Sequence, residues 1–141
     1  MTAKSETNYT RTHRLKGDVL RFFLDDVVEE LDDRADRSSR GRSSKTLVKE
    51  GRLRVTVVSL SENETMETRT TEGPVTLQCL RGHIRVRTHN REMDMSPGEL
   101  MALNTMVDHS VTAMDNATFL LTLALEEEAK TEVEGMPGED G

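Results

Sequence analysis

The sequence predicts an all-β protein, an antiparallel and jelly-roll-like β-barrel that follows an N-terminal arm. From Lys45 onward, short runs rich in Val, Leu, Ile and Thr are separated by Gly, Pro, Asn or charged turns. Several of these runs alternate apolar and polar residues, which is typical of strands with one buried and one wet face. A Ser96-Pro97-Gly98-Glu99 turn leads into an apolar strand, and the next strand opens on His109.

The N-terminal part of the chain lacks this pattern. Residues 1–16 show no apolar periodicity and are predicted to be a flexible lead-in. Residues 17–44 are predicted to form an arm that ends in an Arg/Ser-rich loop. Within the arm, Val19–Leu24 suits a strand. Asp25–Asp36 suits a short helix, because acids stand at its start and arginines near its end.

The loop Arg37–Ser44 allows two interpretations. Its three arginines can clamp a phosphate or a carboxylate. Alternatively, the loop is solvated and balances the charge of the acidic helix before it, which the composition favours.

The barrel itself is predicted to span residues 45–125. Its expected strands share short length and β-branched or apolar composition: Thr46–Val48, Leu53–Leu60, Val75–Leu80, Ile84–Thr88, Glu92–Met95, Leu100–Leu103, Ser110–Ala113 and Thr118–Leu125. The segment Arg87–Arg91 is predicted to be a hairpin turn. Residues 126–141 are acidic and contain Gly and Pro, so we expect a disordered tail.

Composition limits the class of protein. The 141 residues with 34% apolar content predict a single domain, and a formal net charge of -7 argues against nucleic-acid or membrane-surface partners. The single cysteine, Cys79, excludes an internal disulfide and fits a reducing compartment. It lies in an alternating strand, which predicts a buried, inert thiol. No segment resembles a signal peptide or a membrane span, so we expect a cytoplasmic protein.

Three segments together resemble a small single-domain bacterial cupin over about Lys45–Ala124. They are Thr46–Val55, Gly73–Gly82, and the Pro97-Gly98-Glu99 turn with His109. The resemblance implies a conserved β-barrel built on two motifs that flank a hairpin. In many cupins a divalent transition metal is held by two histidines and a glutamate of the first motif and a histidine of the second.

The metal motif of that family is degenerate here. In the second motif Gly98 and His109 match, whereas other residues stand at the proline, glycine and asparagine positions: Asn104, Met106 and Ala113. In the first motif the glutamate position holds Val75. The two histidine positions hold Arg69 and Thr71, or Thr68 and Thr70 with the other spacing. Only His109 survives as a ligand, so the sequence predicts no bound metal and no cofactor.

The remaining acids and histidines do not restore the ligand set. Glu67 offers a carboxylate near the motif but out of register, and Glu72 is a weaker candidate. His83 and His89 lie in or near the hairpin and are predicted to be surface residues.

The predicted ligand site is the mouth of the barrel, lined by His109, Arg69, Gln78, Met101 and Met106. In this prediction Arg69 replaces a metal ligand with a fixed positive charge, which favours a carboxylate or phosphate. Alternatively Arg69 points outward, and His109 serves strand-end hydrogen bonding. The methionines are interpreted as core fillers or as an adaptable pocket lining. No residue is assigned a catalytic role.

These observations leave three functions open. The first is a cupin-type domain that binds a small, anionic ligand without the standard metal site. The second is an enzyme, either acid–base or metal-dependent, with a rearranged ligand set around His109. The third is a homodimeric structural or regulatory module whose Phe22/Phe23 arm docks on a partner barrel. The expected partners are a small molecule and a second copy of the chain.

Overall fold

The computed structural model describes residues 18–68, 72–105 and 107–126. Within these ranges it contains one helix, α2 (Leu24–Arg37), and nine strands. The strands are β1 (Arg42–Glu50), β2 (Leu53–Leu60), β3 (Thr65–Thr68), β4 (Val75–Arg81), β5 (Ile84–Arg87), β6 (Glu92–Met95), β7 (Leu100–Leu103), β8 (His109–Ala113) and β9 (Ala117–Ala124). The predicted all-β architecture is confirmed.

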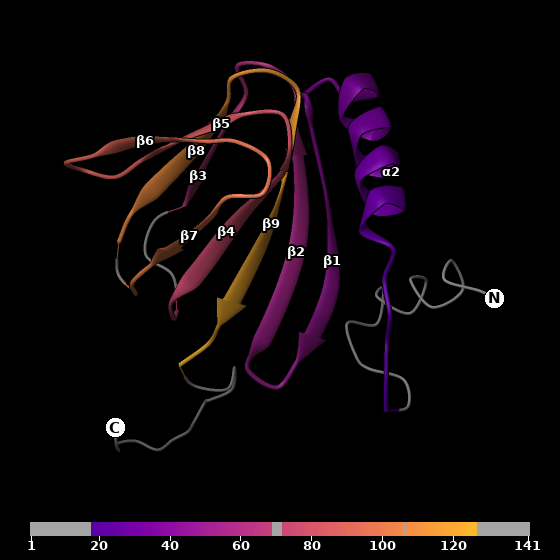
Figure 1. Cartoon of the computed structure of the whole chain (residues 1–141), viewed down its shortest axis with the longest axis vertical. Coiled ribbons are helices and arrows are strands. Elements are labelled where there is room, and N and C mark those ends of the chain that lie inside the picture. Colours follow the sequence, from indigo (N-terminus) through magenta and orange to yellow (C-terminus); the bar gives the residue numbers. More distant parts are fainter. Residues whose placement is uncertain (1–17, 69–71, 106, 127–141) are drawn as a thin grey trace.

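The strands form two antiparallel sheets that face each other (Figure 1). The first sheet has the order β1-β2-β9-β4-β7, and the second has the order β3-β8-β5-β6. Sequence neighbours β3 and β4 lie in different sheets, so the chain crosses between the layers as a jelly roll does. At one side of the barrel, the Arg42 side chain at the start of β1 donates from Nη2 to the Thr65 carbonyl of β3 at 3.0 Å.

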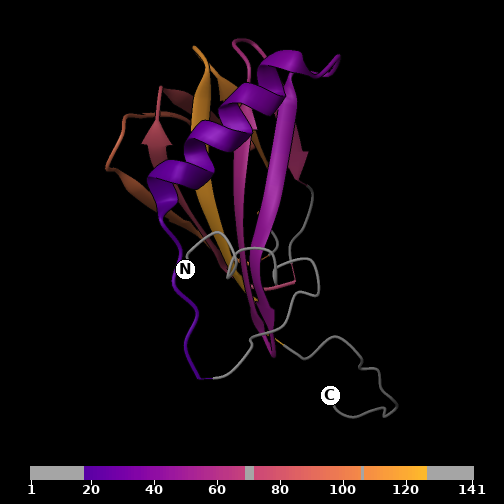
Figure 2. The same cartoon turned by 90° about the vertical axis from the view of Figure 1, so that its right-hand side faces the viewer.

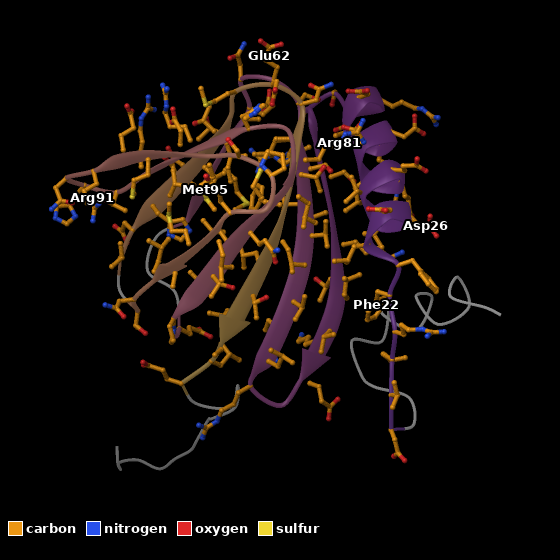
Figure 3. The ribbon with its side chains drawn as sticks, viewed as in Figure 1. Phe22, Asp26, Glu62, Arg81, Arg91 and Met95 are labelled. Carbon is orange, nitrogen blue, oxygen red and sulfur yellow. The ribbon has the colours of Figure 1, made fainter. Side chains whose placement is uncertain are left out.

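The main core lies between the two sheets, where the inward members of the alternating strands meet. Phe119, Leu77, Ile84, Val86 and Val111 are fully buried there. Met95 also packs in this core (Figure 3). Cys79 belongs to the same cluster, as predicted, and burial raises the pKa of its thiol.

Helix α2 covers the outer face of the five-stranded sheet over β1, β2 and β9 (Figure 2). Its apolar side chains recur at helical spacing, and Val27 and Leu31 pack on Leu47 and Val57 of the sheet. Asp25 and Asp26 in the first turn, together with arginines in the last turn, favour the helix through its dipole. The helix is not long and apolar enough to span a membrane, and no other helix occurs in the described ranges.

The structure corrects three sequence predictions. Residues 18–23 form no strand; instead the helix begins at Leu24. The end of the predicted Arg/Ser loop is already β1, because the chain pairs with β2 from Arg42 onward. β3 was missed because its only apolar residue, Met66, gives no alternating pattern. The predicted lead-in (1–16), and the predicted tail apart from Glu126, lie outside the described residues.

The Pro-Gly turn forms as predicted between β6 and β7. Gly98 has a φ of 94°, which favours glycine, and Glu99 N–H donates to the Ser96 carbonyl at 3.1 Å. The Glu99 carboxylate accepts from the Ser96 N–H at 2.9 Å. The turn is joined to β4, because Gly98 N–H donates to the Cys79 carbonyl at 2.9 Å.

Candidate functional site

A cavity of ≈ 600 Å³ lies between the sheets, on the side of the barrel where β1 and β3 meet. Its apolar wall comes from four strands: Val58, Met66, Val75, Leu121 and Leu123. Its polar groups come from the β1 end of the molecule, from β2 and from β8: Arg40, Arg42, Ser43, Ser44, Thr56 and His109. A mostly apolar recess with a few convergent polar groups is the usual form of a small-molecule site.

Strand register explains why these side chains meet. Thr56 pairs with Leu121, and Val58 pairs with Phe119, whose side chain is in the core. These residues therefore point to the interior face of the sheet. Ser44 pairs with Val58 and shares that face, yet it is exposed, so the cavity opens to solvent beside β1.

His109 stands at the first position of β8 and is 5% exposed. Its Nδ1 lies 3.3 Å from the Val107 carbonyl oxygen. A carbonyl can only accept, so Nδ1 carries the hydrogen of this bond. The other ring nitrogen, Nε2, is buried and has no hydrogen-bond partner in the described part of the chain. An unpaired buried nitrogen is energetically costly, and a hydrogen-bond donor placed beside Nε2 would remove that cost.

The opposite end of the cavity carries arginines that the sequence had placed in a loop. Gly41 N–H donates to the Ser38 carbonyl at 3.1 Å, and this turn sets Arg40 and Arg42 on either side of Gly41. Gly41 has a φ of 68°, and a Cβ there would lie 2.8 Å from Cγ of Glu64. The turn therefore favours glycine.

The three loop arginines have different partners. Arg37 is paired with Asp33 of α2 at 2.6 Å, so it is not part of the cavity. Arg42 donates to a backbone carbonyl and keeps other N–H groups. Arg40 has no carboxylate partner among the described residues. Arg40 and Arg42 thus line the cavity without an ion pair among the described residues, although the Glu64 carboxylate lies beside Gly41 between them.

The predicted mouth residues separate into three groups. His109 lines the cavity. Met101 pairs with Leu77 on the interior face, but it packs into the core rather than lining the cavity. Gln78 pairs with Leu120, a residue of the helix-covered face, so its predicted place in the mouth is corrected. Arg69 and Met106 lie outside the described residues.

Sequence reasoning missed Arg40 and Arg42 as lining residues of this cavity. Their anion-clamp potential was visible in the Arg/Ser run, but their partners on β2, β3 and β9 are distant in sequence. Only the crossing of β1 toward β3 brings them together.

A second, smaller recess of ≈ 350 Å³ lies on the other side of His109. It is polar and is lined by Glu67, Arg87, Thr88, His89, Asp108, His109 and Ser110. Glu67 pairs with Ser110, whereas its neighbours Met66 and Thr68 pair with the buried residues Val111 and His109. Glu67 therefore points away from the interior, and Arg87 is already paired with Glu92.

The described residues do not fit the metal site of the standard cupin type. Among them, no three His, Cys, Asp or Glu side chains are grouped so that they could hold a metal ion. His89 and His83 are exposed, as predicted, and His83 Nδ1 lies 2.9 Å from Oδ2 of Asp115. That pairing, with a second bond from the His83 N–H, lowers the pKa of Asp115.

No family model matches this sequence, and no curated protein matches it either. Solved structures do. A cupin superfamily protein from Desulfitobacterium hafniense is 14% identical with a TM-score of 0.59, over 60% of this chain and 78% of that one. Salicylate 1,2-dioxygenase from Pseudoaminobacter salicylatoxidans is 17% identical with a TM-score of 0.61, over 72% of this chain and 31% of that one.

A third similar structure is an HTH_3 family transcriptional regulator from Vibrio cholerae. It is 15% identical with a TM-score of 0.56, over 61% of this chain and 52% of that one. These likenesses include an enzyme and a regulator, so they bear on the fold and not on the activity. Together with the two facing antiparallel sheets, they show that this chain folds as a small cupin-type β-barrel.

Proposed function

We propose that this chain is a small-molecule binding module, and that its barrel cavity takes an anionic ligand with an apolar body. The observation that carries the proposal is the buried, unpaired Nε2 of His109 in the wall of an apolar cavity that also holds two arginines. A ligand supplies what the protein lacks at each of these places.

The apolar part of the cavity provides the driving force for binding. Val58, Leu121 and Leu123 face it from β2 and β9, and a ligand surface placed against them leaves water. The volume lies in the range of cavities that hold drug-sized molecules. Arg40 and Arg42 supply the guanidinium groups that bind carboxylates or phosphates in a bidentate manner.

Acid–base catalysis at His109 has less support. A histidine base is usually oriented by a carboxylate, whereas Nδ1 of His109 is held by a backbone carbonyl. Asp108, its sequence neighbour, lines the outer recess. The arrangement therefore favours binding over proton transfer.

Titration calorimetry with decanoate, decyl phosphate and decanol tests the proposal. We expect the two anions to bind and the alcohol to bind at least tenfold more weakly, because only the anions form charge-assisted bonds. Arg40→Gln is expected to weaken anion binding by about tenfold. Arg69→Ala measures the contribution of the arginine that the sequence placed in the mouth.

The matched control is Arg91→Gln, because Arg91 lies at the β5–β6 hairpin, outside the cavity lining (Figure 3). We expect this variant to bind as the wild type does. The proposal is overturned if no anion binds, or if decanol binds as tightly as decanoate. A stoichiometric transition metal in the purified protein that is lost in His109→Ala would favour the enzyme alternative instead.

A further inference from the structure

Among the polar lining residues of the cavity, Arg42 and His109 lie at different levels along its wall. Arg42 Nη2 bonds to the carbonyl of Thr65, which fixes the arginine end at that level of β3. His109 pairs with Thr68, three residues further along the same strand. Three residues of a strand span about 10 Å. Met66 lies between these two levels and is an apolar part of the lining.

At the His109 end, the unpaired Nε2 can be satisfied only by a hydrogen-bond donor. Because Nδ1 uses its hydrogen on the Val107 carbonyl, the neutral ring has only a lone pair at Nε2. A carboxylate oxygen has no hydrogen to give and would set two acceptors against each other. A hydroxyl group satisfies the nitrogen without bringing a charge into the apolar wall.

An amine is a poorer candidate for this end. The cavity lining contains two arginines and no Asp or Glu. A protonated amine would add a third cation to a lining that already carries two arginines and no carboxylate. A plain fatty acid satisfies the arginines but leaves Nε2 of His109 unpaired.

We infer that the ligand has two different polar ends joined by an apolar body. Its carboxylate lies at Arg40 and Arg42, and its hydroxyl donates to Nε2 of His109. The chemical class is an ω-hydroxy carboxylate. This inference rests on the proposed function and adds to it the second polar group and its character as a donor. Because Nε2 is fully buried, contact with the ligand requires a small rotation of the side chains around it.

The test compares ligands that differ only at the far end. Wild-type protein is titrated calorimetrically at pH 8 with hexanoate, octanoate and decanoate, with the ω-hydroxy acid of each length, and with the corresponding α,ω-dicarboxylates. At the chain length that spans the cavity, we expect the ω-hydroxy acid to bind about tenfold more tightly than the plain acid, since one buried hydrogen bond is added. At shorter lengths the two acids are expected to bind alike.

Two variants assign the effect to His109. In His109→Leu the preference for the hydroxyl is expected to vanish, while the plain acid still binds. In His109→Gln, which keeps a polar group near the Nε2 position, the preference is expected to return in part. The thermal midpoint of each variant shows whether it is folded. The wild-type comparison stands even if one variant is not.

The possible failures differ from one another. Equal binding of plain and ω-hydroxy acids at every length, with the effect of Arg40→Gln retained, overturns the two-ended ligand and leaves the proposed function in place. Tightest binding of a dicarboxylate overturns the assignment of Nε2 as an acceptor. If neither plain nor hydroxy acids bind at any length, both the proposed function and this inference are wrong.

Discussion

The buried imidazole of His109 has opposite effects on folding and on the proposed ligand binding. Its imidazole is buried in the barrel wall, and one of its two nitrogens has no partner among the described residues. Burial of an unpaired polar group opposes folding. Under the proposed function, a ligand completes this polar contact, and the position gives up some stability for binding.

The first prediction follows from this conflict. Replacing His109 with leucine removes the unpaired nitrogen and fills the wall with apolar atoms. We expect the free energy of unfolding to stay unchanged or to rise by about 1 kcal/mol. The loss of the bond to the Val107 carbonyl costs little, because Val107 is half-buried. Urea unfolding followed by circular dichroism measures the free energy of unfolding. A loss of several kcal/mol in the variant would show that the imidazole stabilises the fold.

The second prediction concerns the exposed pair of His83 and Asp115. Bonds from the His83 ring and from the His83 N–H lower the pKa of the Asp115 carboxyl. The stabilisation is therefore complete above the ordinary carboxyl range and is lost as the pH falls through the lowered pKa. Both side chains are half exposed, so solvent screens the effect and it is small.

In urea unfolding, the wild type is expected to lose more stability than Asp115→Asn between pH 7 and pH 2. A variant that loses as much as the wild type would show that the pair does not contribute.

At the residue scale, sequence reasoning succeeded where one pattern determined the outcome. A histidine directly after a turn and at the start of a strand gave the position of His109. Gln78 was misplaced although Val75, Leu77 and Cys79 of the same strand are buried in the barrel. Alternation puts Gln78 on the other face, so the error arose from ignoring strand period.

Elements with strong alternation were predicted within one or two residues, and the two misjudged strands lack it. β3 has the sequence Thr-Met-Glu-Thr, and β1 begins with Arg-Ser-Ser-Lys. In both, pairing with a neighbouring strand supplies the strand character that composition does not. The arm residues 18–23 show the reverse case, in which apolar residues suggest a strand but no partner is present in the described sheets.

The third prediction compares two turn glycines. Gly82 and Gly98 both have positive φ values, 72° and 94°. A Cβ at Gly82 would lie 2.2 Å from the Asn116 carbonyl oxygen, whereas a Cβ at Gly98 would meet nothing within 4 Å. Gly98→Ala is therefore expected to cost about 1 kcal/mol from backbone strain alone. Gly82→Ala is expected to cost at least 2 kcal/mol more, because the β8–β9 turn must also shift. Equal losses in urea unfolding would contradict this reading.

The five-stranded sheet has apolar packing on both of its faces. The cluster with Phe119 lies inside the barrel, and the cluster with Leu31 lies under α2. Arg81 at the end of β4 also reaches Asp32 of α2 at 3.3 Å (Figure 3). The helix of the predicted N-terminal arm therefore packs on the barrel of its own chain.

The fourth prediction tests this unity. Leu31→Ala is expected to lower the free energy of unfolding by about 2–4 kcal/mol, because the side chain is fully buried. The transition should remain single, since the helix shares β1 and β2 with the barrel. Val19→Ala is the matched control: Val19 is 76% exposed, and its loss should stay within about 0.5 kcal/mol. Separate melting of helix and strands would contradict the single domain.

At this scale the fold was predictable and the site was not. Alternation and turn residues are local signals, and they were enough for the barrel. The cavity joins side chains from β1, β2, β3, β4, β8 and β9. The strand order, and the side at which the sheets come together, determine which of these side chains meet. Local sequence patterns predict neither.

The meeting of β1 and β3 has one more consequence. Both strands are outer members of their sheets, and the Arg42 bond to Thr65 connects them at one level. A ligand bound by Arg40 at one end and by His109 at the other would bridge the edges of the two sheets beside β1 and β3. Occupancy would then be felt as slower amide hydrogen exchange along β1 and β3, with β6 and β7 unaffected. Ligand binding would in this way stabilise the contact between the edge strands β1 and β3.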